Sequence, residues 1–250
     1  MCTILLAWHN VNDADFVMAA NRDELIERPA EPPQLLFGDP PIVGGRDLLG
    51  GGTWLAIGEG ERVCAVTNRR TGIKGEVIRD PSRLSRGDIP VDVLRRAERD
   101  VPAFLAGLGP GRYNPVNVLY VSPSAALAAS VDDSGPPRLT ELHIGLHVLT
   151  TGDIDDADSD KNRWLYTFAD RTQKLAKNAF DLEYALRDLM SRHDKPSDDP
   201  LDCVCIHGDV YGTVSAATVI GAHGAVTYRH AQGRPCNTPF SLVDLADLGG

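Results

Sequence analysis

The sequence predicts an α+β protein made of largely antiparallel sheets, with helices segregated onto their outer faces. Strand-like segments occupy both ends of the chain, and the helical patterns come in two pairs between them. The order is therefore strands, helices, strands, helices, strands, which differs from the regular alternation of a parallel doubly wound fold. No repeat or low-complexity linker marks a boundary, so we predict a single domain over residues 1–250.

The chain begins with a predicted hairpin of buried strands. Residues 3–8, TILLAW, are apolar and partly β-branched, and the polar turn HNVNDAD separates them from FVMAA at 16–20. The second strand ends in four polar residues, NRDE, at 21–24. If the hairpin turns about residues 10–14, position 2 lies roughly opposite positions 21–23.

The remaining elements are assigned from periodicity and turn residues. Residues 28–52 are rich in Pro and Gly and predict an irregular surface segment, and a second hairpin follows with strands near 53–58 and 62–67. Helices are predicted at 89–100, 101–109, 159–177 and 180–193, and further strands at 114–122, 125–131, 137–145, 146–152, 201–207, 212–222 and 224–231.

Charge and composition exclude several classes of partner. The chain carries 25 Lys and Arg against 35 Asp and Glu, a net charge of −10, which disfavours nucleic acid and anionic membrane surfaces. No apolar stretch is long enough to span a bilayer, so we expect no stable membrane insertion. No basic region precedes the apolar start, which argues against a secretory signal and predicts a cytoplasmic protein.

The cysteines predict neither a disulfide framework nor a metal site. There are five of them, an odd number without framework spacing. Cys203 and Cys205 would share one face of a strand as small core residues, and they lack the second pair that a zinc site needs. The acidic run at 153–160 lacks the Gly and Glu of a calcium loop and is expected to be a solvated helix entry. We expect no metal ligands and no required cofactor.

Cys2 is the first candidate for chemistry. Removal of Met1 would give this residue both a thiol and a free α-amine. An α-amine titrates near pH 7.7–8.0, so it is partly neutral in the cytosol and can accept the thiol proton. Activation of a nucleophile by its own terminal amine is an established route to covalent catalysis. The alternative is that Cys2 is simply the first residue of a buried strand.

The NRDE segment supplies polar groups close to Cys2. Arg22 offers a forked donor for a carboxylate or carbonyl, Asp23 an acceptor for an ammonium or a thiol, and Asn21 an amide. The alternative is a turn with a solvated ion pair between Arg and an acidic residue.

A third stretch, GGGTWLAIGEGERVCAVTN, ends at Asn68, whose amide at the end of a strand suits an oxyanion donor. Trp54 is expected mainly to pack in the core. Arg69 and Arg70 are either solvated or face an anionic substrate.

Taken together, these stretches resemble the NRDE family, also called the transport and Golgi organization protein two family. The resemblance rests on MCTILLAW, AANRDELIERPA, GGTWLAI, AVTNRR, LSRGDIPVDVL and YGTVSAATVI. It implies a four-layer αββα sandwich of the N-terminal-nucleophile hydrolase type, similar to choloylglycine hydrolases and penicillin acylases. By the motif matches, Cys2 takes the position of the nucleophile, Asp23 that of the adjacent acid and Asn68 that of the oxyanion donor.

The chain also departs from these relatives. The hydrolases carry an Asn in the strand that reads VLTTGD here, where Thr151 stands. The NRDE family usually has an Arg after YGT, where this chain has Val214, and the hydrolase Arg ahead of the acid is Ala20 here. The nucleophile, acid and first amide are therefore present without the full hydrolase set.

Two functions follow from the resemblance. The first is hydrolysis of an amide or related acyl bond of a small molecule by Cys2, Asp23 and Asn68. The residues expected to bind substrate are Asn21, Arg22, Glu24, Trp54, Arg69 and Thr151. The second is a carrier for haem or for an acyl-CoA or lipid, as NRDE relatives are associated with haem mobilisation. Candidate haem ligands are Cys2, His9, His143, His147, His193, His207, His223 and His230, without diagnostic spacing.

Overall fold

The contacts within the chain divide it into two units, each with its own antiparallel sheet and helices. The first unit is Met1–Arg28 with His143–Asp244, and the second is Pro29–Leu142 with Leu245–Gly250. This computed structural model describes residues 2–71 and 80–246. The expected single domain over 1–250 stays a prediction.

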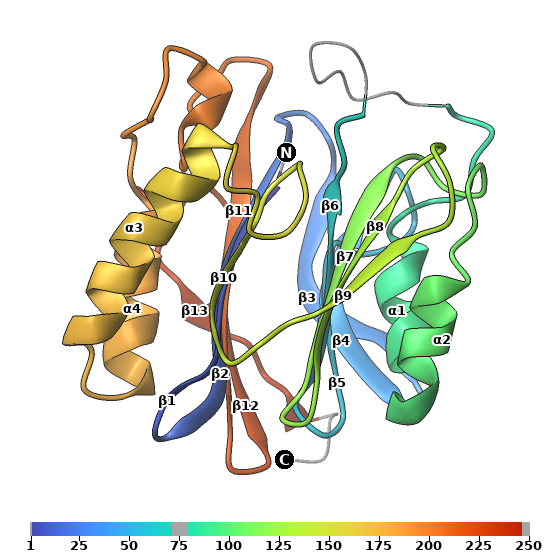
Figure 1. The fold of residues 1–250 in the computed structure, drawn as a ribbon, viewed down its shortest axis with the longest axis horizontal. Helices are drawn as coiled ribbons and strands as arrows, with labels where there is room; N and C mark the ends of the chain where they lie inside the picture. Colours follow the sequence, from blue (N-terminus) through green and yellow to red (C-terminus); the bar gives the residue numbers. More distant parts are fainter. Residues whose placement is uncertain (1, 72–79, 247–250) are drawn as a thin grey trace. The chain divides into compact units, whose positions relative to one another are not determined.

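The first unit is built around a six-stranded sheet with the order β10-β1-β2-β11-β12-β13 (Figure 1). Its strands are β1 (Cys2–Val11), β2 (Ala14–Leu25), β10 (Gly145–Leu149), β11 (Tyr211–Ala222), β12 (Ala225–Ala231) and β13 (Ser241–Leu242). The predicted N-terminal hairpin is confirmed, and its register pairs Cys2 with Arg22. This register follows from the short polar turn between the two strands. Both strands are buried in continuous runs, Cys2–Ala7 in β1 and Phe16–Asp23 in β2.

Two helices, α3 (Asp160–Leu175) and α4 (Ala179–Met190), lie side by side over one face of this sheet (Figure 1). The side chains of Ser159 and Asn178 cap their first turns by accepting backbone N–H bonds. Leu165 of α3 and Leu186 of α4 are fully buried in a cluster with strand residues such as Leu5. Burial of these apolar stripes, at about 1.5–3 kcal/mol for each large side chain, holds the helices on the sheet.

The second unit contains a seven-stranded sheet with the order β3-β4-β5-β6-β7-β8-β9. Its strands are β3 (Ala30–Gly38), β4 (Pro41–Asp47), β5 (Leu55–Gly58), β6 (Arg62–Asn68), β7 (Val116–Val121), β8 (Ala126–Val131) and β9 (Arg138–Glu141). Helices α1 (Asp88–Leu94) and α2 (Val101–Ala106), with a 3-10 turn at Glu98–Asp100 between them, bury Ile89, Val93 and Leu105 in the core of this unit.

The prediction of an irregular segment at 28–52 is wrong, because β3 and β4 lie there. Proline lacks a backbone N–H, but β3 is an edge strand, and its register shifts between Glu31 and Gln34, around Pro32 and Pro33. A Cβ on Gly44 would lie 2.6 Å from the carbonyl oxygen of Leu55, so the close approach of β4 and β5 requires glycine there.

The predicted strand at 201–207 is also wrong. A 3-10 turn at Pro200–Asp202 opens this segment, and the rest is irregular. Its backbone groups form hydrogen bonds with a side chain and with a loop, and not with a neighbouring strand. Asn21 Nδ2 donates to the carbonyl of Val204, and Cys205 N donates to the carbonyl of Arg192. The apolar run is buried because these bonds satisfy its backbone polar groups.

The α+β class with largely antiparallel sheets is confirmed by both units. Among the residues that the structure describes, no helix has the length and apolar character required to cross a bilayer.

Candidate active site

Cys2 lies at the start of β1 and is 7% exposed. It faces Arg22 across the β1–β2 ladder. Burial raises the pKa of this thiol, and the negative charge of Asp23 adds to the rise, whereas the Asp23 backbone and Arg22 oppose it. The thiol is therefore mostly protonated at neutral pH, and it needs a base before it can act as a nucleophile.

Asp23 is an acidic residue near Cys2 whose side chain and backbone both accept hydrogen bonds. Its side chain is buried, Thr213 Oγ1 donates to its Oδ1 over 2.6 Å, and the hydroxyl of Tyr211 donates to its backbone carbonyl over 2.8 Å. Burial raises the pKa of the carboxyl to about 6, although the charge of Lys161 and the Thr213 bond lower it. A carboxyl with such a pKa gains or loses a proton close to neutral pH, as acid–base groups of active sites do.

Lys161 is a residue of this site that the sequence analysis missed. It lies in the first turn of α3 and is 6% exposed, and its Nζ donates to the carbonyls of Cys203 (3.0 Å) and Leu201 (3.3 Å). Its charge also acts on the Asp23 carboxyl. A lysine at the start of an amphipathic helix normally indicates a solvated residue, so the sequence carries no signal for this role.

Neighbouring residues of the NRDE segment point to opposite faces of the sheet. Cys2 and Arg22 form a directly opposed pair and so share one face, as does Ser215, which pairs with Arg22 from β11. The positive charge of Arg22 lowers the pKa of His230, after the larger effect of burial. Val214 falls at the register shift between Thr213 and Ser215. Because of this shift, Thr213 pairs with Asp23 and Ser215 pairs with Arg22.

Asn21 lies on the other face, where α4 packs. Its Nδ2 donates to the carbonyls of Met190, the last residue of α4, and Val204, both over 2.9 Å. Its side chain thus anchors α4 and the loop before β11 to the sheet, which is a structural role.

Glu24 and Thr151 are both half-buried. One oxygen of Glu24 accepts the backbone N–H of Leu25, and the other lies 3.8 Å from Arg28. Thr151 sits in a bend directly after β10, two residues beyond the last rung of the β1–β10 ladder.

The other predicted residues belong to the second unit. Asn68 is the last residue of β6, half-buried and paired with Val116, and Trp54 is half-buried just before β5. The Arg69 guanidinium donates to Asp132 over 2.9 Å and to Asn117 over 3.2 Å, so these bonds hold its position within this unit. Arg70 is half-buried.

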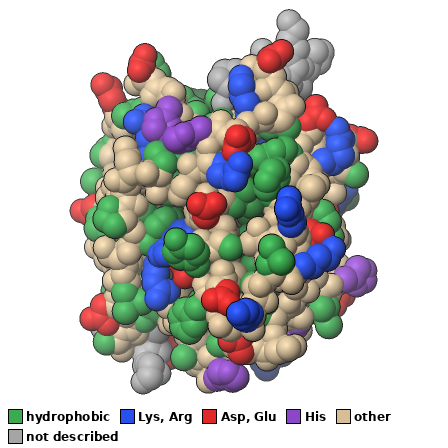
Figure 2. Space-filling model, turned by 90° about the vertical axis from the view of Figure 1, so that its left-hand side faces the viewer, with side chains coloured by type: hydrophobic (Ala, Val, Ile, Leu, Met, Phe, Trp, Pro, Cys, Tyr) green, Lys and Arg blue, Asp and Glu red, His purple; other side chains and the backbone are tan. Residues whose placement is uncertain are grey.

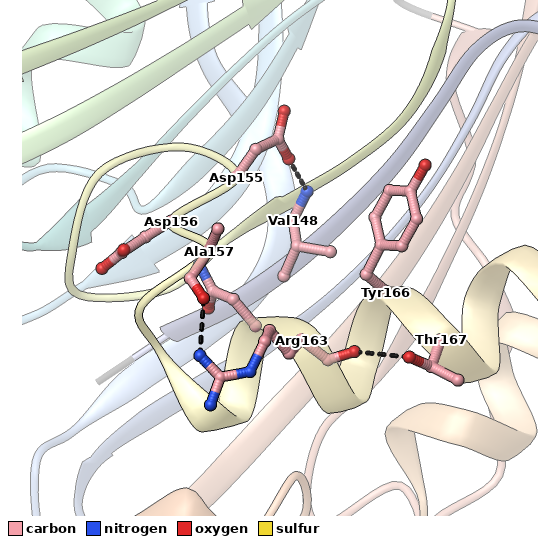
Figure 3. A pocket seen from close by; sticks show the side chains of 8 residues that line it. Val148, Asp155, Asp156, Ala157, Arg163, Tyr166 and Thr167 are labelled. Carbon is pink, nitrogen blue, oxygen red and sulfur yellow. Dashed lines mark hydrogen bonds between the residues drawn. The ribbon is translucent and has the colours of Figure 1, made fainter.

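A pocket of about 300 Å³ opens beside the start of α3, and its lining includes none of the residues predicted to act in catalysis or substrate binding. Its lining includes Val148, Asp155, Arg163 and Tyr166 (Figure 3). Asp155 accepts the N–H of Val148 over 2.7 Å, and its other oxygen lies 2.7 Å from His147 Nδ1. These bonds occupy the Asp155 carboxylate.

The candidate haem ligands have varied surroundings. His9 lies 3.8 Å from Asp15, and Nε2 of His230 lies 2.8 Å from the side chain of Gln232. One group in the part of the chain that the structure describes does combine ligands that suit a metal, in contrast to the sequence expectation. It consists of His193, Cys205, His207 and Cys236.

The structure is similar to several solved acylases. It superposes on penicillin V acylase from Agrobacterium tumefaciens with a TM-score of 0.61 and 11% identity, over 99% of this chain and 88% of that one. For the Caenorhabditis elegans ortholog of N-acylethanolamine-hydrolyzing acid amidase the TM-score is 0.57 at 15% identity, over 88% of this chain and 92% of that one.

A conjugated bile acid hydrolase from Clostridium perfringens gives a TM-score of 0.54 at 13% identity, over 100% of this chain and 94% of that one. These proteins have the N-terminal-nucleophile hydrolase fold, so the fold predicted from the resemblance is confirmed. No curated protein sequence matches the chain significantly. The family model described as Transport and Golgi organisation 2 matches residues 1–229. The sequence motifs and the fold agree with this match, and the chain belongs to this family.

Proposed function

We propose that this protein is an N-terminal-cysteine hydrolase that cleaves an amide or related acyl bond of a small molecule. The observation that carries the proposal is the environment of Cys2: a buried thiol that opposes Arg22, with the Asp23 carboxyl, whose pKa is about 6, close enough for its charge to act on the thiol. The acylase fold of the structural neighbours supports the same reaction class.

The base is the α-amine that removal of Met1 would give to Cys2. Met1 itself lies outside the described residues. Because burial raises the pKa of the thiol, Cys2 needs a proton acceptor within reach, and its own amine is one. Asp23 would hold and orient this amine by a charge-assisted hydrogen bond.

The reaction would run in two halves. The sulfur attacks the carbonyl carbon while the amine takes the thiol proton, and this proton then goes to the departing amine of the substrate. Water afterwards cleaves the thioester and releases the acid. We assign Asn68 as an oxyanion donor from the resemblance, and loss of such a donor costs about 10²–10³ in turnover.

Arg22 is the strongest candidate for substrate contact. It opposes Cys2 on the same face of the sheet, and a guanidinium there suits the carbonyl or carboxylate of an acyl amine. Glu24, Trp54, Arg69 and Thr151 keep their predicted roles as substrate contacts, whereas the bonds of Asn21 point to an anchoring role.

The test compares the wild type with Cys2→Ala on a panel of N-acyl amines, after intact mass has established whether Met1 is removed. We expect hydrolysis only by processed wild type, and an acyl adduct on Cys2 when turnover is stopped by acid. Cys64→Ala, a buried thiol of the second unit, is the matched control. Equal rates for wild type and Cys2→Ala, or a retained Met1 in an active sample, would refute the mechanism.

The carrier alternative, with haem or acyl-CoA as cargo, stays a prediction. It is tested by titrating the same two proteins with each cargo, and the absence of saturable binding would contradict it.

A further inference from the structure

Three segments that are distant in sequence meet at one point of the first unit. They are the stretch after α4, the loop that precedes β11 and the loop that follows β12. Each contributes side chains with soft or borderline ligand atoms: His193, then Cys205 and His207, then Cys236. One ligand atom from each of these four residues lies within 4.8 Å of all the others.

Two of the distances between ligand atoms can be compared with those around a tetrahedral ion. The sulfur atoms of Cys205 and Cys236 are 3.6 Å apart, and Nε2 of His207 is 3.1 Å from the Cys236 sulfur. A tetrahedron with Zn–S bonds of about 2.3 Å and Zn–N bonds of about 2.05 Å has S···S edges of about 3.8 Å and N···S edges of about 3.6 Å. The larger of these two differences, on the N···S edge, involves His207, which is exposed.

The position of the four side chains also suits an ion. The cluster grades from the buried Cys205 through the half-buried Cys236 to the two exposed histidines, whose ring centroids are 4.6 Å apart. Figure 2 shows histidine side chains next to one another at the surface of the face that carries α3 and α4. An ion could therefore enter from solvent and end on ligands fixed by the interior.

The backbone around the ligands is fixed before any ion binds. Cys205 N donates to the carbonyl of Arg192 over 2.9 Å, and a guanidinium nitrogen of Arg234 donates to the carbonyl of Gly208 over 3.1 Å. These bonds tie the ligand segments together in pairs. A Cβ on Gly208 would lie 2.2 Å from the carbonyl oxygen of Tyr211, so the tight turn after His207 needs glycine.

We propose that His193, Cys205, His207 and Cys236 form a structural zinc site that fastens the loop before β11. Two thiolates and two imidazoles are a donor set that zinc takes in closed, four-coordinate sites. Binding would release the two thiol protons to solvent, so that the ion and its ligands form a neutral site. Four protein ligands leave no position for a catalytic water, and the role assigned is therefore structural.

The fastened loop is the one that supports Asp23. The carbonyl of Cys203 accepts from Lys161, and the N–H of Ile206 donates to Thr213 Oγ1, which itself donates to Asp23. Thr213 N also donates to the carbonyl of Ile206. Zinc would thus stabilise the partners of the Asp23 carboxyl without touching it.

The test measures the metal content of the full chain, purified without chelator under reducing conditions. We expect about one zinc per chain. After exchange, Co²⁺ should give the visible d–d bands of tetrahedral coordination and the near-ultraviolet band of a thiolate–cobalt bond. Cys236→Ser and His193→Ala should each weaken zinc binding at least about tenfold, as loss of a ligand removes more than a supporting contact would.

The neighbouring thiol supplies the control. The Cys203 sulfur lies 3.1 Å from the carbonyl of His193 but is not one of the four ligands, so Cys203→Ser should keep the metal and the cobalt spectrum. His193 is exposed, so its variant is expected to fold even if Cys236→Ser does not. Zinc-free protein that does not take up Co²⁺, an octahedral cobalt spectrum without a thiolate band, or a Cys205–Cys236 disulfide in reduced samples would overturn the proposal.

Discussion

Replacing Asp23 by Asn should make the protein more stable at neutral pH while it removes activity. The Asp23 carboxyl is buried, and burial raises its pKa from 3.8 to about 6. Asparagine resembles the protonated carboxyl in shape, and its Oδ1 can still accept the hydrogen bond from Thr213. The variant therefore avoids the cost of an ionised group in the interior.

The magnitude follows from the two pKa values. The difference between 3.8 and about 6 corresponds to about 3 kcal/mol, at about 1.4 kcal/mol per pH unit. The folded state binds the proton more tightly than the unfolded state does. This carboxyl therefore favours folding below its unfolded pKa, and that contribution is lost as the pH rises through about 6. The stability advantage of Asp23→Asn should be small at about pH 4 and approach about 3 kcal/mol at about pH 8.

Urea unfolding of both proteins across this pH range is the assay, because a constant m-value allows the free energies of unfolding to be compared. Asp188→Asn, at an exposed position of α4, is the matched control and should show no such trend. An advantage that is independent of pH, or that is largest in acid, would refute the reasoning. It would mean that Lys161 holds the carboxyl as an anion in the folded state.

Three further predictions concern the supports of the two units. Lys161→Met removes the charge that lowers the pKa of Asp23, so the midpoint of the pH dependence described above should move to higher pH. The free energy of unfolding should also fall by about 1–3 kcal/mol, because buried carbonyls lose their hydrogen-bond donor. Although burial opposes the shift, hydrogen bonds from Ser134 and Arg69 lower the pKa of Asp132 to about 2. Asp132→Asn should therefore lower the free energy of unfolding by about 1–2 kcal/mol at neutral pH. Urea unfolding should show that this difference disappears as the pH falls from about 3.8 to about 2. Leu186→Ala, at a fully buried position of α4, should cost about 2–5 kcal/mol by the same assay, whereas Leu175→Ala, at a position that is 75% exposed, should change stability by less than about 0.5 kcal/mol.

The N-terminal hairpin could be predicted because its signals are local. Two apolar runs and the polar turn between them predict which residues are opposed, and the expected pairing of position 2 with positions 21–23 is confirmed by the Cys2–Arg22 rung. The same period of two separates Asn21 from Arg22, and the structure places them on opposite faces. The whole NRDE segment therefore does not gather around the thiol.

The remaining features depend on contacts that periodicity does not encode. Lys161 reaches the site because the backbone between Pro200 and Ile206 is irregular and offers carbonyls to its ammonium. The Pro-rich β3 is tolerated because it is an edge strand, a property of the folded sheet. The sulfur atoms of Cys236 and Cys205 lie 3.6 Å apart because the loop after β12 approaches the loop before β11. Local residue propensity does not predict how two loops pack together.

The loop before β11 connects the two proposals, and this connection separates them experimentally. Its residues carry the carbonyls that hold Lys161, the N–H that orients Thr213 and two of the proposed zinc ligands. If zinc fastens this loop, chelation should weaken hydrolysis by loosening the partners of Asp23, while Cys2 still reacts with a small alkylating agent. If hydrolysis is absent altogether, chelation should still lower the unfolding temperature and abolish the cobalt spectrum. The zinc site is therefore tested by the cobalt spectrum and the metal content, and the hydrolase mechanism is tested by the Cys2 variant.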